Sequence, residues 1–156
     1  MFSPSNKPVK LEEGTTEGLV TLTLEVIPKH KQNLKAYVIS LDAGENRWNV
    51  PFTSAVRKAL KFVKDDKEGC VLITRSSSPK FFSNGLDLAN LDLNNKEVAE
   101  SFGHEAMSSF ADVLDLPIPT ICLLQGHAFG AVSLLESQLD NCISQVETGN
   151  DACTCP

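Results

Sequence analysis

The chain has 156 residues and a formal net charge of −6, with 42% hydrophobic and 22% charged residues. This composition suits one ordinary domain with a core and is typical of neither disordered nor membrane-spanning chains. The acidic balance argues against a general nucleic-acid binder, and no segment approaches the roughly 18 apolar residues of a membrane span.

Charge and cysteine are distributed unevenly. Residues 1–131 hold all 14 basic residues and 16 acidic ones, whereas residues 132–156 hold four acidic residues and no Lys or Arg. Three of the five cysteines also lie in residues 132–156. We therefore expect a flexible lead-in over 1–17, a core over 18–131 and a divergent acidic, cysteine-containing tail over 132–156.

The core begins with two strand patterns. Apolar residues alternate from Leu19 to Ile27, and Ala36–Asp42 is a second strand-like run, so the two predict a hairpin. A helix is predicted next, because apolar residues recur at helical spacing at Phe52, Val56, Leu60 and Val63.

The rest of the chain alternates strands with helices. Cys70–Thr74 and Thr120–Leu124 are short apolar runs, typical of strands buried on both faces. A longer helix is predicted over Asn95–Leu116 between them, and Pro117 ends it. A last amphipathic helix is predicted from the spacing of Val132, Leu135, Leu139, Ile143 and Val146. This order of elements is an α/β arrangement that begins with a β-β-α unit.

Two glycine-containing turns follow the two apolar strands. Gly85 can adopt a backbone conformation that turns the next amide, that of Leu86, into a cleft. Gly130 does the same for the amide of Ala131, which would stand at a helix N-terminus that favours negative charge. Two such amides form an oxyanion hole, which stabilises an enolate oxygen. Taken singly, each pattern is more typical of an ordinary loop turn.

The surroundings of the turns carry a family resemblance. The runs KFFSNGLDL (residues 80–88) and GHAFGA (residues 126–131) resemble, in order, two signatures of the enoyl-CoA hydratase/isomerase (crotonase) superfamily. Residues 46–49 fall where that family places an Asn-containing acyl-CoA loop. Within the family the runs are most similar to Δ3,Δ2-enoyl-CoA isomerases of the plant-like peroxisomal type, and the resemblance extends from about Gly18 to Ala131.

The resemblance implies the N-terminal half of a crotonase-like ββα spiral that binds an acyl-CoA or enoyl-CoA thioester. The backbone N–H groups of Leu86 and Ala131 would hold the thioester oxygen. Asp87 would also cap the short helix that follows it. Coenzyme A belongs to the substrate, so no separate cofactor and no metal are implied. The substrate-binding residues implied are Ser83, Asn84, Gly85, Leu86, Asp87 and Gly130.

The family's isomerases move a double bond from position 3 to 2-trans in fatty-acid β-oxidation, with a Glu beyond the second turn as base. No residue here matches that Glu, and Leu134 stands where hydratases carry one. Glu136 is the nearby carboxylate, in a place typical of a solvated helix end. We therefore expect little or no turnover. We also do not expect the family's homotrimer, because its assembly helices follow the second turn. A non-catalytic acyl-CoA-binding fragment and a hydratase-like member remain the alternatives.

Other candidate sites are less specific. Ser83, His127 and Asp87 could form a hydrolase triad, but no Gly-x-Ser-x-Gly motif is present. Cys153 and Cys155 could bind a soft metal, but no second pair of ligands lies nearby.

Two features near residue 50 each have two interpretations, and one of these is contact with coenzyme A. Trp48 either stacks on the adenine or is buried beside Phe52. The basic face of residues 57–67 either meets phosphates or is simply solvated. The resemblance implies peroxisome or mitochondrion, but neither address is present in the chain, so the cytoplasm is the alternative.

Overall fold

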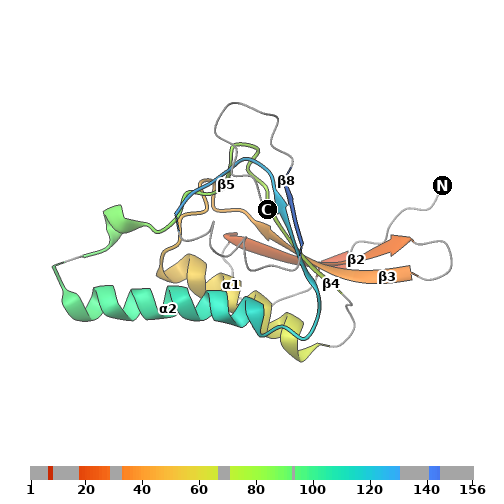
Figure 1. The fold of residues 1–156 in the computed structure, drawn as a ribbon, viewed down its shortest axis with the longest axis horizontal. Helices are drawn as coiled ribbons and strands as arrows, with labels where there is room; N and C mark the ends of the chain where they lie inside the picture. Colours follow the sequence, from red (N-terminus) through yellow and green to blue (C-terminus); the bar gives the residue numbers. More distant parts are fainter. Residues whose placement is uncertain are drawn as a thin grey trace.

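The computed structural model describes residues 7–8, 18–28, 33–66, 71–92, 94–130 and 141–144. One mixed sheet carries two long helices on one of its faces, and a small second sheet lies at one end (Figure 1). In chain order the elements are β1 Lys7–Pro8, β2 Val20–Pro28, β3 Asn33–Leu41, α1 Val50–Asp65, β4 Val71–Ser76, β5 Phe81–Ser83, the 3-10 helix η1 Leu88–Asn90, α2 Lys96–Leu114, β6 Thr120–Leu124, β7 His127–Ala128 and β8 Asn141–Ser144.

The predicted hairpin is confirmed. β2 and β3 pair antiparallel over their whole length, from Val20 opposite Leu41 to Pro28 opposite Asn33. Alternation along β2 buries Val20 and Leu22 and exposes Thr21, as expected for a strand with one covered face. Within the expected lead-in, β1 adds two residues to the free edge of β2.

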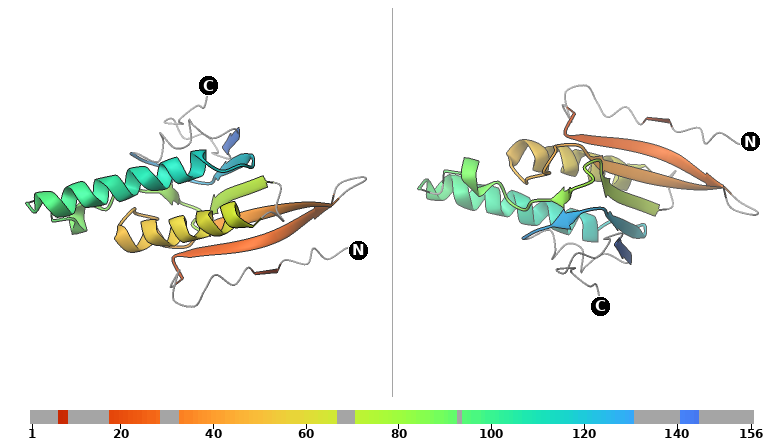
Figure 2. Two further views of the ribbon diagram at one scale, coloured as in Figure 1. Left: turned by 90° about the horizontal axis from the view of Figure 1, so that it is seen from below. Right: turned by 90° about the horizontal axis from the view of Figure 1, so that it is seen from above.

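Helix α1 begins where its sequence provides a cap. The Asn49 side chain accepts a hydrogen bond from the Phe52 amide (3.0 Å), and Pro51 needs no amide partner in the first turn. The predicted apolar stripe of α1 is buried against the sheet. Helix α2 begins in the same way, with Asn95 capping the Val98 amide. The two helices lie side by side (Figure 2).

Strands β3, β4, β6 and β8 run parallel, and the six-stranded order is β1-β2-β3-β4-β6-β8. The prediction that β4 and β6 are buried on both faces was wrong. Leu72 and Cys122, on the face under the helices, are buried, whereas Ile73, Ile121 and Leu123 on the other face are half-buried. The apolar composition of these strands therefore exceeds what the helix-covered core alone requires.

The predicted helix over 132–146 was wrong where the structure describes that segment. Residues 141–144 form β8, which pairs parallel with β6 from Ile121 opposite Asn141 to Leu124 opposite Ser144. A strand at this place satisfies the backbone groups along the β6 edge, and that outweighs a helical apolar spacing. The remainder of the expected helix lies outside the described residues.

The aromatic residues of the core settle the position of Trp48. Its side chain is only 3% exposed and makes edge-to-face contacts with Phe52 and Phe110, at centroid distances of 5.3 and 5.1 Å. Of the two readings of Trp48, burial is correct, and the indole is not a platform for adenine.

Candidate functional site

The small sheet brings the two glycine-containing turns together. β5 and β7 pair parallel, with Phe81 opposite His127 and Ser83 opposite Ala128. Backbone hydrogen bonds run from the His127 amide to the Lys80 carbonyl (2.9 Å) and from the Phe129 amide to the Ser83 carbonyl (3.0 Å). Segments that are far apart in the sequence thus meet at the end of β4 and β6.

Glycine is required at the points of closest approach. Gly85 has φ +75°, and a Cβ there would lie 3.0 Å from the Phe129 carbonyl oxygen. Gly126 has φ +91°, and its Cβ would lie 2.5 Å from the Lys80 carbonyl oxygen. Gly130 has φ +69°, and a Cβ there would be 3.8 Å from the Gly85 Cα. The predicted turns are therefore packed backbone against backbone.

The Leu86 amide is placed by its neighbours. The Trp48 amide donates to the Gly85 carbonyl (2.8 Å), and the Asp87 amide donates to the Trp48 carbonyl (2.8 Å). In a trans peptide the N–H points opposite to the preceding C=O, so the Leu86 N–H points away from Trp48. Within the described part of the chain this N–H makes no hydrogen bond. Ala131, the other predicted donor, lies outside the described residues.

A buried asparagine that the sequence reasoning missed supports this arrangement. Asn46 is 0% exposed and has φ +48°, the left-handed region that Asn tolerates better than most residues. Its Oδ1 accepts from the Ala43 amide (2.9 Å), while its Nδ2 donates to Ser76 Oγ (2.8 Å) and to the Phe82 carbonyl (2.9 Å). The resemblance placed this residue in a substrate loop. Gly44, two residues earlier in the chain, was the available sign of a turn.

Ser83 and Asn84, two of the predicted binding residues, have internal partners. Ser83 is 0% exposed, and its Oγ donates to the Asn46 carbonyl (2.7 Å). The Asn84 amide donates to the Glu45 carbonyl (2.9 Å), and its Nδ2 donates to Glu45 Oε2 (3.0 Å). The hydrogen bond from Asn84, followed by that from Arg47, holds the pKa of Glu45 below its ordinary value.

Asp87 occupies the residue before η1, but its carboxylate does not cap that helix. Instead it accepts from Asn90 Nδ2 at both oxygens (3.0 Å each) and from Asn49 Nδ2 (3.5 Å). The capping expectation was therefore wrong, because side-chain amides outcompete the backbone for this 7%-exposed carboxylate. Asp87 links the turn to the start of α1.

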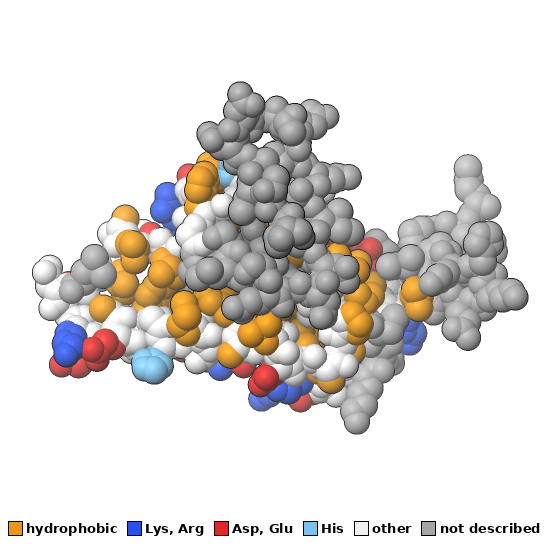
Figure 3. Space-filling view, viewed as in Figure 1, with side chains coloured by type: hydrophobic (Ala, Val, Ile, Leu, Met, Phe, Trp, Pro, Cys, Tyr) orange, Lys and Arg blue, Asp and Glu red, His pale blue; other side chains and the backbone are white. Residues whose placement is uncertain are grey.

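A groove of ≈ 360 Å³ adjoins Asp87 at the N-terminal end of α1. Its polar side chains bond to one another or cap α1, so its remaining wall is apolar. Figure 3 shows hydrophobic side chains on the surface in this region, between η1 and α2. The groove is lined by Asn49, Val50, Pro51, Asp87, Asn90, Leu91 and Phe102.

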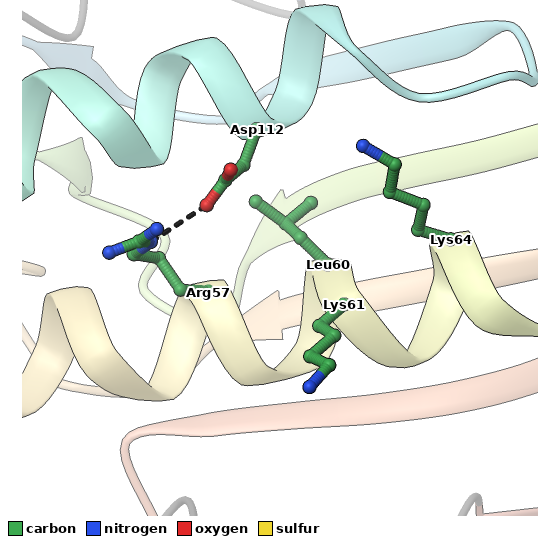
Figure 4. Close-up of a pocket in the computed structure, with 5 residues that line it drawn as sticks. All are labelled: Arg57, Leu60, Lys61, Lys64 and Asp112. Atoms are coloured by element: carbon green, nitrogen blue, oxygen red, sulfur yellow. Dashed lines mark hydrogen bonds and ion pairs between the residues drawn. The ribbon is translucent and has the colours of Figure 1, made fainter.

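A second hollow, of ≈ 270 Å³, lies between α1 and α2 and includes part of the basic face (Figure 4). Arg57 Nε pairs with Asp112 Oδ2 at 2.7 Å across the two helices, and Leu60 lies between Arg57 and Lys64. This solvated ion pair joins the helices. The hollow lies away from the paired turns along α1, and a role for it in phosphate binding stays a prediction.

The remaining candidates do not form reactive sites among the described residues. The triad of Ser83, His127 and Asp87 is not assembled, because Ser83 Oγ is bonded to the Asn46 carbonyl and the exposed His127 ring stacks on Phe129 at 5.8 Å. Residues 7–8, 18–28, 33–66, 71–92, 94–130 and 141–144 contain no group of three or more metal-ligating side chains. Four further candidates from the sequence, Leu134, Glu136, Cys153 and Cys155, lie outside the described residues. Over the same ranges, the helices lack an apolar stretch long enough to cross a bilayer.

Comparison with known proteins agrees with the fold, and the matched region contains both turns. A family model described as Enoyl-CoA hydratase/isomerase matches residues 35–147, which reaches beyond Ala131 and includes β8. Enoyl-CoA delta isomerase 1, peroxisomal, from Arabidopsis thaliana is 34% identical over 108 residues, covering 68% of this chain and 44% of that protein. Enoyl-CoA delta isomerase 2, peroxisomal, from the same plant is 35% identical, covering 68% and 46%.

More distant relatives and solved structures share the same core. Methylglutaconyl-CoA hydratase, mitochondrial, from Mus musculus is 30% identical over 87 residues, covering 56% of this chain and 28% of that protein. Pseudomonas aeruginosa DspI superposes with a TM-score of 0.69 at 20% identity, covering 88% of this chain and 49% of that one. An enoyl-CoA hydratase from Bacillus anthracis gives 0.65 at 21%, covering 78% and 46%.

The chain spans less than half the length of the Arabidopsis relatives it matches. The family model nevertheless covers most of the chain, and the fold it describes is the one observed, with an α/β crotonase-like core. On these grounds the chain belongs to the enoyl-CoA hydratase/isomerase family.

Proposed function

We propose that this chain binds an acyl-CoA thioester and holds its carbonyl oxygen between the backbone N–H groups of Leu86 and Ala131. The observation that carries the proposal is the Leu86 N–H, which makes no hydrogen bond within the described residues and follows Gly85, packed against Gly130. An amide held rigidly in this way stabilises a developing oxyanion at little cost in reorganisation.

The reaction that suits this site is the shift of a 3-enoyl-CoA double bond to the 2-trans position. A base removes a proton from C2, the electron pair moves onto the thioester oxygen as a dienolate, and the proton returns at C4. The similarity to plant enoyl-CoA delta isomerases favours this reaction within fatty-acid β-oxidation, in peroxisome or mitochondrion. No residue of the 156 matches the family's glutamate base, so binding and turnover are tested separately.

The groove beside Asp87 is suited to the acyl chain. It adjoins the residues that follow Leu86, its side chains Asn49 and Asn90 donate to Asp87, and its apolar surface includes Val50, Leu91 and Phe102. Removing an alkyl chain from water into such a groove is favourable in proportion to the area buried. We therefore place the thioester oxygen at Leu86 and the alkyl chain along the start of α1.

Isothermal titration with two matched ligands tests the proposal. Hexanoyl-CoA and S-hexyl-CoA share the coenzyme and the alkyl chain, and only the first has the carbonyl. We expect hexanoyl-CoA to bind about tenfold more tightly, the gain of a strong hydrogen bond in a dry site. Equal affinities would show that no oxyanion site operates.

Turnover is tested separately, by following the conjugated 2-enoyl thioester in ultraviolet absorbance after addition of 3-enoyl-CoA. A rate comparable to those of complete isomerases would overturn the expected impairment. Loss of absorbance on addition of 2-trans-enoyl-CoA would instead indicate hydration. That outcome would fit the similarity to the mouse hydratase and would replace isomerisation as the proposed reaction.

A further inference from the structure

A buried polar network lies directly behind the Leu86 amide, and none of its side chains is open to solvent. Asn46 and Ser83 are both 0% exposed, and Ser76 is 4% exposed. We propose that Ser83 and Asn46 are positioning residues, which set the direction of the Leu86 N–H without touching the ligand. This inference rests on the proposed function, because it assigns a task to groups that support the same oxyanion site.

Ser83 joins the turn to the loop behind it. Its Oγ donates to the Asn46 carbonyl at 2.7 Å and accepts from the Gly85 amide at 3.3 Å. The hydroxyl therefore holds the amide side of Gly85, while the Trp48 amide holds the carbonyl side of the same residue at 2.8 Å. Both peptide planes of Gly85 are fixed, and the second of them contains the Leu86 N–H.

Gly85 needs this restraint more than another residue would. Without a Cβ, glycine has many accessible backbone conformations, and the Gly85–Leu86 peptide could rotate if only one side were held. A donor directed at an oxyanion is effective only within a narrow range of position, so a rotated peptide would lose the contact. Ser83 thus supplies a constraint that the glycine itself cannot.

Asn46 fixes the acceptor to which Ser83 is bonded. Its side chain holds the Ala43 amide, Ser76 at the end of β4 and the Phe82 carbonyl in β5, so its own carbonyl has one position. Every polar atom of that side chain facing the core is paired. A fully satisfied network of this kind is rigid and transmits the position of the sheet to the turn.

Two serine-to-alanine variants test the positioning role. Ser83→Ala removes the hydroxyl behind Gly85. Ser109→Ala is the matched control, because Ser109 is also 0% exposed and its Oγ donates to a backbone carbonyl, that of Ala106, at 2.6 Å within α2. The measured quantity is the ratio of the dissociation constants of S-hexyl-CoA and hexanoyl-CoA, which is independent of the fraction of folded protein.

We expect Ser83→Ala to lower this ratio about fivefold, the loss expected when one ordinary hydrogen bond is weakened, with S-hexyl-CoA affinity unchanged. Ser109→Ala should keep the wild-type ratio although its melting temperature falls by a similar amount. Ser83→Cys retains a weak donor and should recover part of the ratio, and it replaces the alanine variant if that does not fold.

The outcomes separate the two proposals. A wild-type ratio of one overturns the oxyanion site and the positioning role together. A wild-type preference for the thioester that Ser83→Ala retains overturns the positioning role alone. If Ser83→Ala lowers the affinity for both ligands by the same factor, Ser83 has only a structural role.

Discussion

Two buried polar atoms in the core lack hydrogen bonds within the described residues: Trp48 Nε1 and Thr53 Oγ1. The Trp48 ring makes edge-to-face contacts with the rings of Phe52 and Phe110, and an aromatic face is a weak acceptor for an N–H group. Thr53 lies in α1 at 0% exposure, so its unpaired hydroxyl is removed from water.

Replacing Thr53 by its apolar isostere should therefore stabilise the fold. Thr53→Val keeps the shape and removes the desolvated hydroxyl, and we expect the free energy of unfolding to rise by about 1 kcal/mol. Thr53→Ser keeps the hydroxyl and loses a buried methyl, which should cost about 1 kcal/mol. Urea denaturation distinguishes them. Equal destabilisation by both variants would mean that the hydroxyl has a partner.

Asn46 shows the opposite case, in which every polar atom is used. Asn46→Ala leaves the part-buried Ala43 amide and the buried Phe82 carbonyl without their partner and places a Cβ residue at φ +48°, so we expect a loss of about 3 kcal/mol in urea denaturation. Asn46→Gly loses the same hydrogen bonds but tolerates that φ, and should be about 1 kcal/mol more stable than Asn46→Ala. The reverse ranking would place the strain elsewhere.

At the scale of elements, the turns and the helices respond oppositely to the same substitution. Gly126→Ala would place a Cβ 2.5 Å from the Lys80 carbonyl oxygen and must separate β5 from β7, so we expect a loss of about 3 kcal/mol and loss of thioester preference. Gly103→Ala lies within α2 with nothing within 4 Å of its Cβ. It should stabilise by about 0.5–1 kcal/mol in thermal unfolding. Tolerance of both would contradict the pairing of the small sheet.

Because the alkyl chain is placed in the groove at the start of α1, the affinity for acyl-CoA should depend on the length of that chain. Affinity should rise about fourfold for each added methylene until the groove is filled. Val50→Asp places a carboxylate at its rim and should flatten this dependence, whereas Leu114→Asp, a residue of similar exposure at the far end of α2, should leave it intact. Titration with butanoyl-, hexanoyl- and octanoyl-CoA measures the slope. If Val50→Asp leaves the dependence of affinity on chain length unchanged, the groove is not part of the binding site.

For the whole molecule, periodic patterns predicted the long elements well. The hairpin, α1, β4, α2 and β6 all occur in the expected order, because local spacing and caps such as Asn49 decide them. β5, β7 and β8 were missed, since each is a short segment defined by its partner strand. The two turns were identified from their glycines, whereas the role of Asn46 depends on contacts with β4 and β5 that no local pattern records.

The parallel pairing of β5 with β7 also has a kinetic consequence. Phe81 and His127 meet only after the intervening chain, α2 included, has closed into a loop, so this contact is of high sequence separation and is expected to form late in folding. A ligand that accepts hydrogen bonds from both turns would link the two segments that this loop closure brings together. It would bind the native state alone and would slow the first local opening of the small sheet.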